Sequence, residues 1–89
     1  MHMTKRDKLI ERLLQRPVNF EYDEARSLLM RFNYSEENRG RTSGSRVAFV
    51  NSETGHIIRL HKPHPANTLK RYQIEQLIEE LLKQGVIKP

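Results

Sequence analysis

Apolar side chains recur at helical spacing in two stretches of the first third of the chain. The stripe within residues 4–15 is narrow and consists of Leu9, Ile10, Leu13 and Leu14. The stripe within residues 23–32 follows the i, i+3, i+4, i+7 spacing and consists of Ala25, Leu28, Leu29 and Phe32. Both patterns predict amphipathic helices. Thr4 and Asp7 favour the start of the first helix, and Pro17 favours its end. Asn33 favours the end of the second helix.

The middle of the chain changes to a pattern typical of β-strands. Residues 46–51 and 56–60 are rich in β-branched and other apolar side chains, and they flank a four-residue turn that ends in Gly55. This arrangement predicts a β-hairpin. Residues 34–37 give a weaker signal for a further strand, and residues 38–45 have the composition of a loop. The alternation along residues 46–51 places Phe49 in the core.

A long helix is predicted from Thr68 or Lys70 to Gln84, with Gly85 as its stop signal. Its expected apolar face consists of Leu69, Tyr72, Leu77, Ile78, Leu81 and Leu82. The element order is therefore helix, helix, strand, strand, strand, helix. The simplest way to bury these stripes is an α+β fold in which helices pack on one face of a three-stranded antiparallel sheet. We expect the first helix to pack on its own domain.

The positive charge of the chain is concentrated in its middle. The 89 residues include 16 Lys and Arg against 11 Asp and Glu, which gives a formal net charge of +5. Residues 38–71 alone hold seven basic side chains and one acidic side chain, a local charge of +6, together with three of the four histidines. Such clustering favours a polyanionic partner, most commonly nucleic acid. The length predicts one domain with a small core and no deep enclosed pocket.

Several classes of protein are disfavoured by what the sequence lacks. The chain has no cysteine, which excludes a disulfide framework and a thiolate metal site and is typical of a reducing compartment. No apolar run approaches the ~18–20 residues that span a bilayer, and no secretory signal pattern opens the chain. We expect a cytoplasmic protein without membrane contact. Residues 1–3 are typical of a cloning scar or an alternative start.

Four features follow one another along the chain between Tyr22 and Ile87. They are the sequence Arg41-Thr42-Ser43-Gly44-Ser45, the hairpin, the sequence Leu60-His61-Lys62-Pro63-His64-Pro65 and the leucine-rich last helix. In this order and spacing the chain resembles the HicA-type toxins of bacterial toxin–antitoxin pairs. The resemblance implies a double-stranded-RNA-binding-like α-β-β-β-α fold over residues 17–89, with residues 1–16 as an N-terminal helical extension. It also implies a metal-independent endoribonuclease that cleaves mRNA, and a HicB-type antitoxin that covers the active site.

The sequence departs from the family at one position that matters for catalysis. The family usually carries its catalytic histidine directly after Gly-Ser at the start of the second strand, whereas this chain has Arg46 there. Arginine cannot act as a base in a protein, but it can hold phosphate bidentately. Histidine suits proton transfer near neutral pH. We therefore expect Arg46, His61 and His64 to form the catalytic site, because the loop after the third strand leaves the sheet where Arg46 enters it.

Further basic and polar residues are candidates for binding the RNA phosphates. These candidates are Arg41, Ser45, Arg59 and Lys62. Gly40 and Gly44 allow the backbone between them to form an anion-binding nest, although a flexible connector has the same composition. His56 lies at the far end of the hairpin, where cross-strand packing is expected. His61 and His64 lack the further ligands that zinc requires, so no metal and no cofactor is expected.

Two other functions fit the same residues. The first is a non-catalytic RNA- or DNA-binding module of the same fold, which the missing histidine favours. The second is a protein-interaction domain that uses the acidic residues 21–37 or the first helix as its contact. A homodimer and a hetero-oligomer with the antitoxin both remain open.

Overall fold

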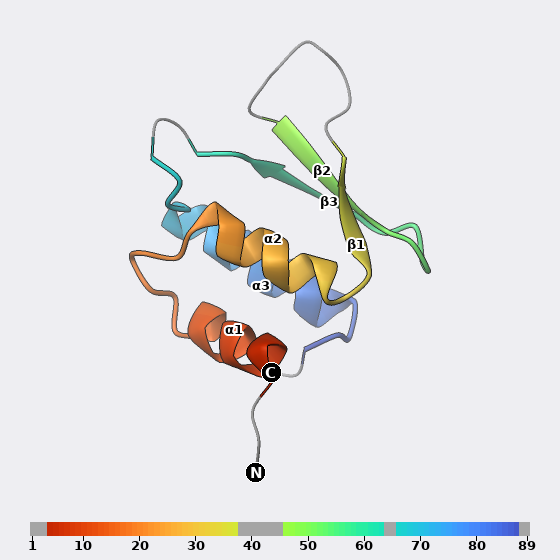
Figure 1. Ribbon diagram of the computed structural model, residues 1–89, viewed down its shortest axis with the longest axis horizontal. Helices are drawn as coiled ribbons and strands as arrows, with labels where there is room; N and C mark the ends of the chain where they lie inside the picture. The colour runs from red at the N-terminus through yellow and green to blue at the C-terminus, as the bar shows by residue number, and fades with distance from the viewer. Residues whose placement is uncertain (1–3, 38–45, 64–65, 88–89) are drawn as a thin grey trace.

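The structure is a computed structural model that describes residues 4–37, 46–63 and 66–87. The described elements are α1 (Lys5–Leu14), α2 (Tyr22–Met30), β1 (Tyr34–Glu37), β2 (Arg46–Asn51), β3 (Ile57–His61) and α3 (Arg71–Lys83). Their order along the chain and their arrangement are shown in Figure 1. The expected α+β class and the weakly signalled strand β1 are confirmed. Within the described ranges, no helix has the length and apolar character needed to cross a membrane.

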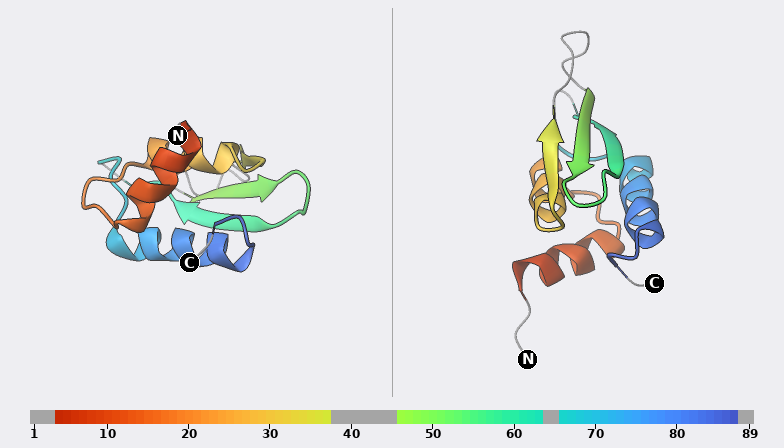
Figure 2. Two further views of the ribbon diagram at one scale, coloured as in Figure 1. Left: turned by 90° about the horizontal axis from the view of Figure 1, so that it is seen from below. Right: turned by 90° about the vertical axis from the view of Figure 1, so that its right-hand side faces the viewer.

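The three strands form one antiparallel sheet in the order β1-β2-β3, so β1 and β3 are its edges. Side chains alternate in burial along β2 and β3 because successive residues of a strand point to opposite faces. Val47, Phe49, Ile58 and Leu60 are buried on the face toward the helices. The opposite face, onto which the right-hand view of Figure 2 looks, has no described helix in front of it.

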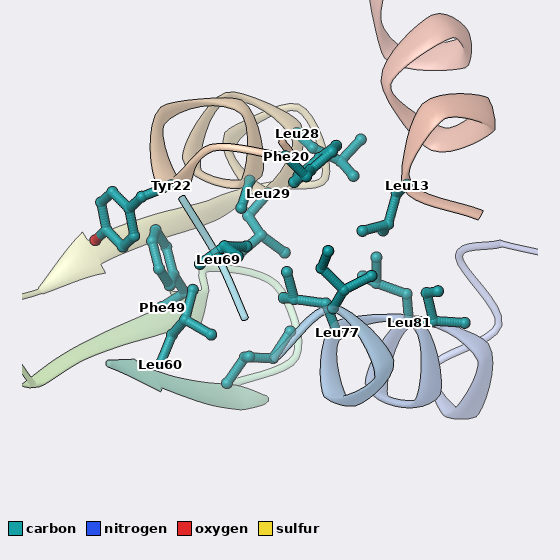
Figure 3. Close-up of a cluster of buried hydrophobic side chains, with 14 of the residues drawn as sticks. Leu13, Phe20, Tyr22, Leu28, Leu29, Phe49, Leu60, Leu69, Leu77 and Leu81 are labelled. Carbon is teal, nitrogen blue, oxygen red and sulfur yellow. The ribbon is translucent and has the colours of Figure 1, made fainter. Parts of the chain in front are cut away.

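The hydrophobic core lies between the sheet and the helices and continues between the helices themselves. Figure 3 shows side chains from α1, α2, α3 and the sheet meeting in one cluster. Helix α1 lies on the side of α2 and α3 away from the sheet (Figures 1 and 2), where Leu9 and Leu13 are buried. Burying a leucine side chain contributes about 1.5–3 kcal/mol. The expectation that the first helix packs on its own domain is therefore confirmed.

The sequence signals at the ends of the helices are confirmed by the backbone. Thr4 and Asp7 form a reciprocal capping box at the start of α1. Arg16 has a φ of 52° immediately before Pro17, which disfavours the right-handed helical conformation at Arg16. Asn33 and Gly85 follow α2 and α3 and have φ values of 70° and 72°. This left-handed conformation is typical of the residue that ends a helix.

The chain between β3 and α3 returns to the start of α2. The Tyr22 N–H donates to the Asn67 carbonyl at 2.7 Å, and the Leu69 N–H donates to the Phe20 carbonyl at 2.8 Å. Glu21 and Thr68 form an isolated antiparallel bridge between these contacts. The segment that leads into α3 is therefore held beside the segment that leads into α2.

The expected apolar face of α3 includes Tyr72 and Leu82, but both are exposed, and the third strand differs from its expected bounds. Tyr72 was expected in the core, but it is 62% exposed. Gln73 and Ile74 are buried instead, because the core-facing rows of α3 run through them to Leu77, Ile78 and Leu81. At 3.6 residues per turn, Tyr72 is rotated by about 100° from Gln73 and leaves the core. The third strand begins at Ile57 and ends at His61, one residue later at each end than expected. Phe49 is fully buried, as predicted.

Candidate nucleic-acid interface

Arg46 and His61 lie directly opposite each other at one end of the sheet. They are Cα partners in the register of β2 and β3, and the next pair on the same face is Ala48 with Arg59. Directly opposed residues of an antiparallel pair have Cβ atoms ~4.5–5.5 Å apart. Arg46, Arg59 and His61 are all exposed on the face away from the helices. We call these three residues the basic sheet face. The expected meeting of Arg46 and His61 at one end is present, while their catalytic role stays a prediction.

The two arginines of the basic sheet face have no carboxylate partner among the described residues. Other arginines of the chain do form ion pairs, with N–O distances of 2.6–3.1 Å, namely Arg12, Arg16, Arg26 and Arg71. An arginine without an acidic partner keeps all five donors available for an anion. Ala48 lies beside Arg59 and presents only a methyl group. Glu37 lies on the other side of Ala48 in the same cross-strand row, so this face carries one acidic residue beside its basic ones.

Lys62 lies on the helix side of the sheet rather than on the basic sheet face. Its Nζ atom is 5.4 Å from the centroid of the Tyr22 ring. The Tyr22 hydroxyl donates to Glu36 on β1, and Arg26 Nε donates to the same carboxylate at 2.9 Å. Lys62 was predicted as a phosphate ligand together with Arg59, and the structure separates the two onto opposite sides of β3. A phosphate held by Lys62 would therefore lie on the other side of β3 from one held by Arg59.

The residues around Glu36 favour the ionised form of its carboxyl. Burial raises the pKa of the Tyr22 hydroxyl, and its hydrogen bond to Glu36 raises it further. Burial by itself would also raise the pKa of the Glu36 carboxyl. The hydrogen bonds from Tyr22 and Arg26, with the charges of Arg26 and Lys62, outweigh burial and lower that pKa. Glu36 is thus held as an anion by three neighbours and is satisfied without any ligand.

Gln73 is a buried polar residue that connects α3 to the backbone of His61. Its Oε1 accepts the Lys70 N–H at 2.9 Å, and its Nε2 donates to the His61 carbonyl at 2.7 Å. One turn later, Gln76 Nε2 donates to the Arg59 carbonyl at 3.0 Å. These amides satisfy carbonyls of the edge strand β3 that have no neighbouring strand. The signal for Gln73 was a polar residue between Leu69 and Leu77 at i, i+4 spacing, which the sequence analysis did not use.

His56 belongs to the opposite end of the sheet. Its Nδ1 is 2.7 Å from the Tyr34 hydroxyl, and its Nε2 is 3.0 Å from a carboxylate oxygen of Glu80. The imidazole also meets the Tyr34 ring edge to face, with centroids 5.9 Å apart. Burial raises the pKa of the Tyr34 hydroxyl. His56 therefore joins β1, the hairpin and α3 through polar contacts, and its role there is packing, as expected.

Several predicted residues lie outside the described residues. These are Arg41 and Ser45, with the glycine nest around them, and His64. Among the residues that the structure describes, no three His, Cys, Asp or Glu side chains are grouped closely enough to hold a metal ion. Comparisons of the chain with protein-family models, with curated proteins and with solved structures found no match. The geometry of the basic sheet face is therefore the main basis for a functional proposal.

Proposed function

We propose that this protein is the toxin of a toxin–antitoxin pair, an RNA-binding and RNA-cleaving protein of the HicA type that a HicB-type antitoxin neutralises. The observation that carries the proposal is the placement of Arg46 opposite His61 on an exposed face, with Arg59 beside them. The element order also agrees with the double-stranded-RNA-binding-like topology that the resemblance implies. The protein would act on mRNA in the cytoplasm.

The chemistry of RNA cleavage fits the residue types of this face. The 2′-oxygen of a ribose attacks the adjacent phosphorus, the bond from phosphorus to the 5′-oxygen breaks, and a cyclic phosphate and a 5′-hydroxyl result. A base must take the proton of the 2′-hydroxyl, and an acid must protonate the departing 5′-oxygen. His61 is suited to one of these proton transfers, and His64 is the predicted partner for the other.

Arg46 takes an electrostatic role in this scheme. Its guanidinium can hold two oxygens of the scissile phosphate and stabilise the extra negative charge of the transition state. Arg59 lies two residues before His61 on the same face, and it would hold the neighbouring phosphate. The arginine that replaces the family's histidine thus retains binding and charge stabilisation, and the proton transfers fall to the loop after β3.

The test is cleavage of RNA by the purified full chain in the presence of a metal chelator. His61→Ala should lower the cleavage rate by about 10²–10⁴-fold, the usual contribution of a general acid or base. Arg46→Lys keeps the charge but loses the bidentate geometry, so it should be slower than wild type and faster than Arg46→Ala. His64→Ala completes the set. Arg31→Ala is the matched control, because Arg31 is an exposed arginine directly after α2, away from the basic sheet face.

The results separate the proposal from its alternatives. Undiminished cleavage by all three alanine variants of Arg46, His61 and His64 would discard the site. If the wild-type chain binds RNA without cutting it and does not arrest growth when expressed, it is a non-catalytic module. Arg46 in place of the family's histidine favours this alternative. A chain that binds no nucleic acid even at low salt would be a protein-interaction domain.

A further inference from the structure

Tyr72 is an exposed aromatic ring in the first turn of α3, the helix whose Gln73 and Gln76 contact β3. The other two tyrosines, Tyr22 and Tyr34, are 1% and 3% exposed, whereas Tyr72 is 62% exposed. Among the described residues, Tyr72 has no ring contact and its hydroxyl has no hydrogen-bond partner. A single exposed apolar side chain needs no explanation by itself. The position of this ring relative to His61 is what gives it significance.

Two glutamine contacts determine which residues of β3 lie beside Tyr72. Gln76 reaches the Arg59 carbonyl and Gln73 reaches the His61 carbonyl, so α3 and β3 run in opposite directions along their contact. Tyr72 is four residues before Gln76 and lies on the same helical row, one turn closer to the helix start. One turn of helix advances about 5.4 Å. The ring therefore lies beside the end of β3, level with His61 and the residues that follow it.

The charges around Tyr72 match a polyanion. Lys70 and Arg71 precede it at the start of α3, and Lys62 follows His61 on the adjacent loop. The acidic residue of this helix nearest to Tyr72 is Glu75, which Arg16 and Arg71 contact at 2.9 and 3.1 Å. The hydrogen bonds from Arg16 and Arg71 lower the pKa of the Glu75 carboxyl. Glu75 and Arg71 thus neutralise each other, and Lys70 is the cation next to Tyr72 on α3 that has no acidic partner among the described residues.

We propose that Tyr72 stacks against an unpaired base of RNA bound at the basic sheet face, so that the preferred substrate is single-stranded. This inference rests on the proposed RNA-binding function. Exposed aromatic rings beside cationic grooves are the usual stacking platforms for single strands. A base inside a duplex is already stacked and paired, and it cannot lie on the ring without being extruded. Because Gln73 and Gln76 hold α3 against β3, the stacked base stands at a fixed distance from His61.

The test compares binding of the full chain to a single strand and to the same strand in a duplex. The strand carries 2′-O-methyl groups so that no cleavage occurs during the measurement. Tyr72→Ala should weaken single-strand binding by about tenfold, which is within the range measured for loss of one stacked base. Tyr72→Phe should bind like wild type, and Tyr72→Leu, which is apolar without a ring face, should resemble Tyr72→Ala. Duplex binding should change little in all three.

Val18→Ala is the control, because Val18 is the most exposed large apolar residue among those described and lies in the connection before α2. Equal single-strand binding by Tyr72→Ala and wild type would overturn the inference. An equal loss for the duplex would overturn the preference for unpaired RNA. If Tyr72→Ala keeps RNA binding but escapes neutralisation by the antitoxin, the ring is a protein anchor instead. Failure of wild type itself to bind RNA would remove the proposed function and this inference together.

Discussion

The polar side chains at the two ends of the sheet differ in whether they have partners within the protein. At the end that holds the hairpin turn, Asn51, His56 and Tyr34 are mutually bonded or bonded to neighbouring elements. At the other end, the arginines of the basic sheet face, Arg46 and Arg59, have no acidic partner among the described residues, and both are exposed. Satisfied polar groups at one end stabilise the fold, whereas donors left open at the other are available to a ligand. The comparison indicates that the polar side chains of the turn end contribute to stability, whereas the arginines of the basic sheet face contribute no described ion pair to it.

The largest loss of stability is expected from a substitution at the turn end of the sheet. Asn51 is 7% exposed, its Oδ1 accepts from the N–H groups of Glu53 and Thr54, and its Nδ2 donates to the Phe32 carbonyl. Asn51→Ala should lower the free energy of unfolding by about 2–3 kcal/mol, because buried backbone groups lose their partners. Chemical denaturation measures this. Asn67→Ala, at an exposed position, should cost far less, and equal losses in the two variants would show that the Asn51 contacts do not stabilise the turn.

A smaller effect is expected where α3 meets the open end. Gln73→Met keeps the volume but removes both hydrogen bonds, so unfolding should become easier by about 1–2 kcal/mol. Because one of those bonds holds the His61 carbonyl, the NMR signals of the His61 ring should also shift, and RNA cleavage should fall more than stability alone explains. Gln76→Met is the control, since its amide reaches Arg59 and is more exposed. Unchanged His61 signals in Gln73→Met would restrict Gln73 to a packing role.

The smallest stability effect concerns Glu36 on the helix side of the open end. Its pKa in the folded chain lies below the ordinary value, so its contribution to stability is present above about pH 4.3 and is lost as the pH falls through the folded pKa. Glu36→Gln should cost about 1 kcal/mol near neutral pH, and the difference from wild type should disappear as the pH falls through the folded pKa of Glu36. Unfolding curves across this range measure it. A difference that stays constant with pH would mean that the Glu36 charge is not what stabilises the cluster.

The local features of the fold could be predicted from the sequence because their causes are local. The Thr4 cap, the left-handed stop at Asn33 and the burial of Phe49 each depend on a few neighbouring residues. The error at Tyr72 arose because tyrosine was counted as apolar, although its hydroxyl and its position allow it to face solvent. The buried Gln73 was missed because only its partner, twelve residues earlier in β3, explains a polar side chain in an apolar row.

The candidate site could be predicted only as far as strand register allows. The placement of Arg46 opposite His61 follows from a hairpin around the turn at 52–55, which the sequence signals clearly. The opposite placement of Lys62 follows from the alternation of side chains past His61. Its contacts with Tyr22 and Glu36 could not be predicted, because they form only in the folded chain. The tie from His56 to Glu80 likewise spans twenty-four residues.

The central proposal is that the basic sheet face binds RNA phosphates through Arg46 and Arg59, which have no acidic partner among the described residues. Its most direct test is the dependence of single-strand RNA binding on salt concentration, measured for wild type, Arg46→Ala and Arg31→Ala. Loss of one phosphate contact should reduce the slope of log K against log salt by about 0.7. We expect this reduction in Arg46→Ala and an unchanged slope in Arg31→Ala. Equal slopes in all three proteins would contradict the claim.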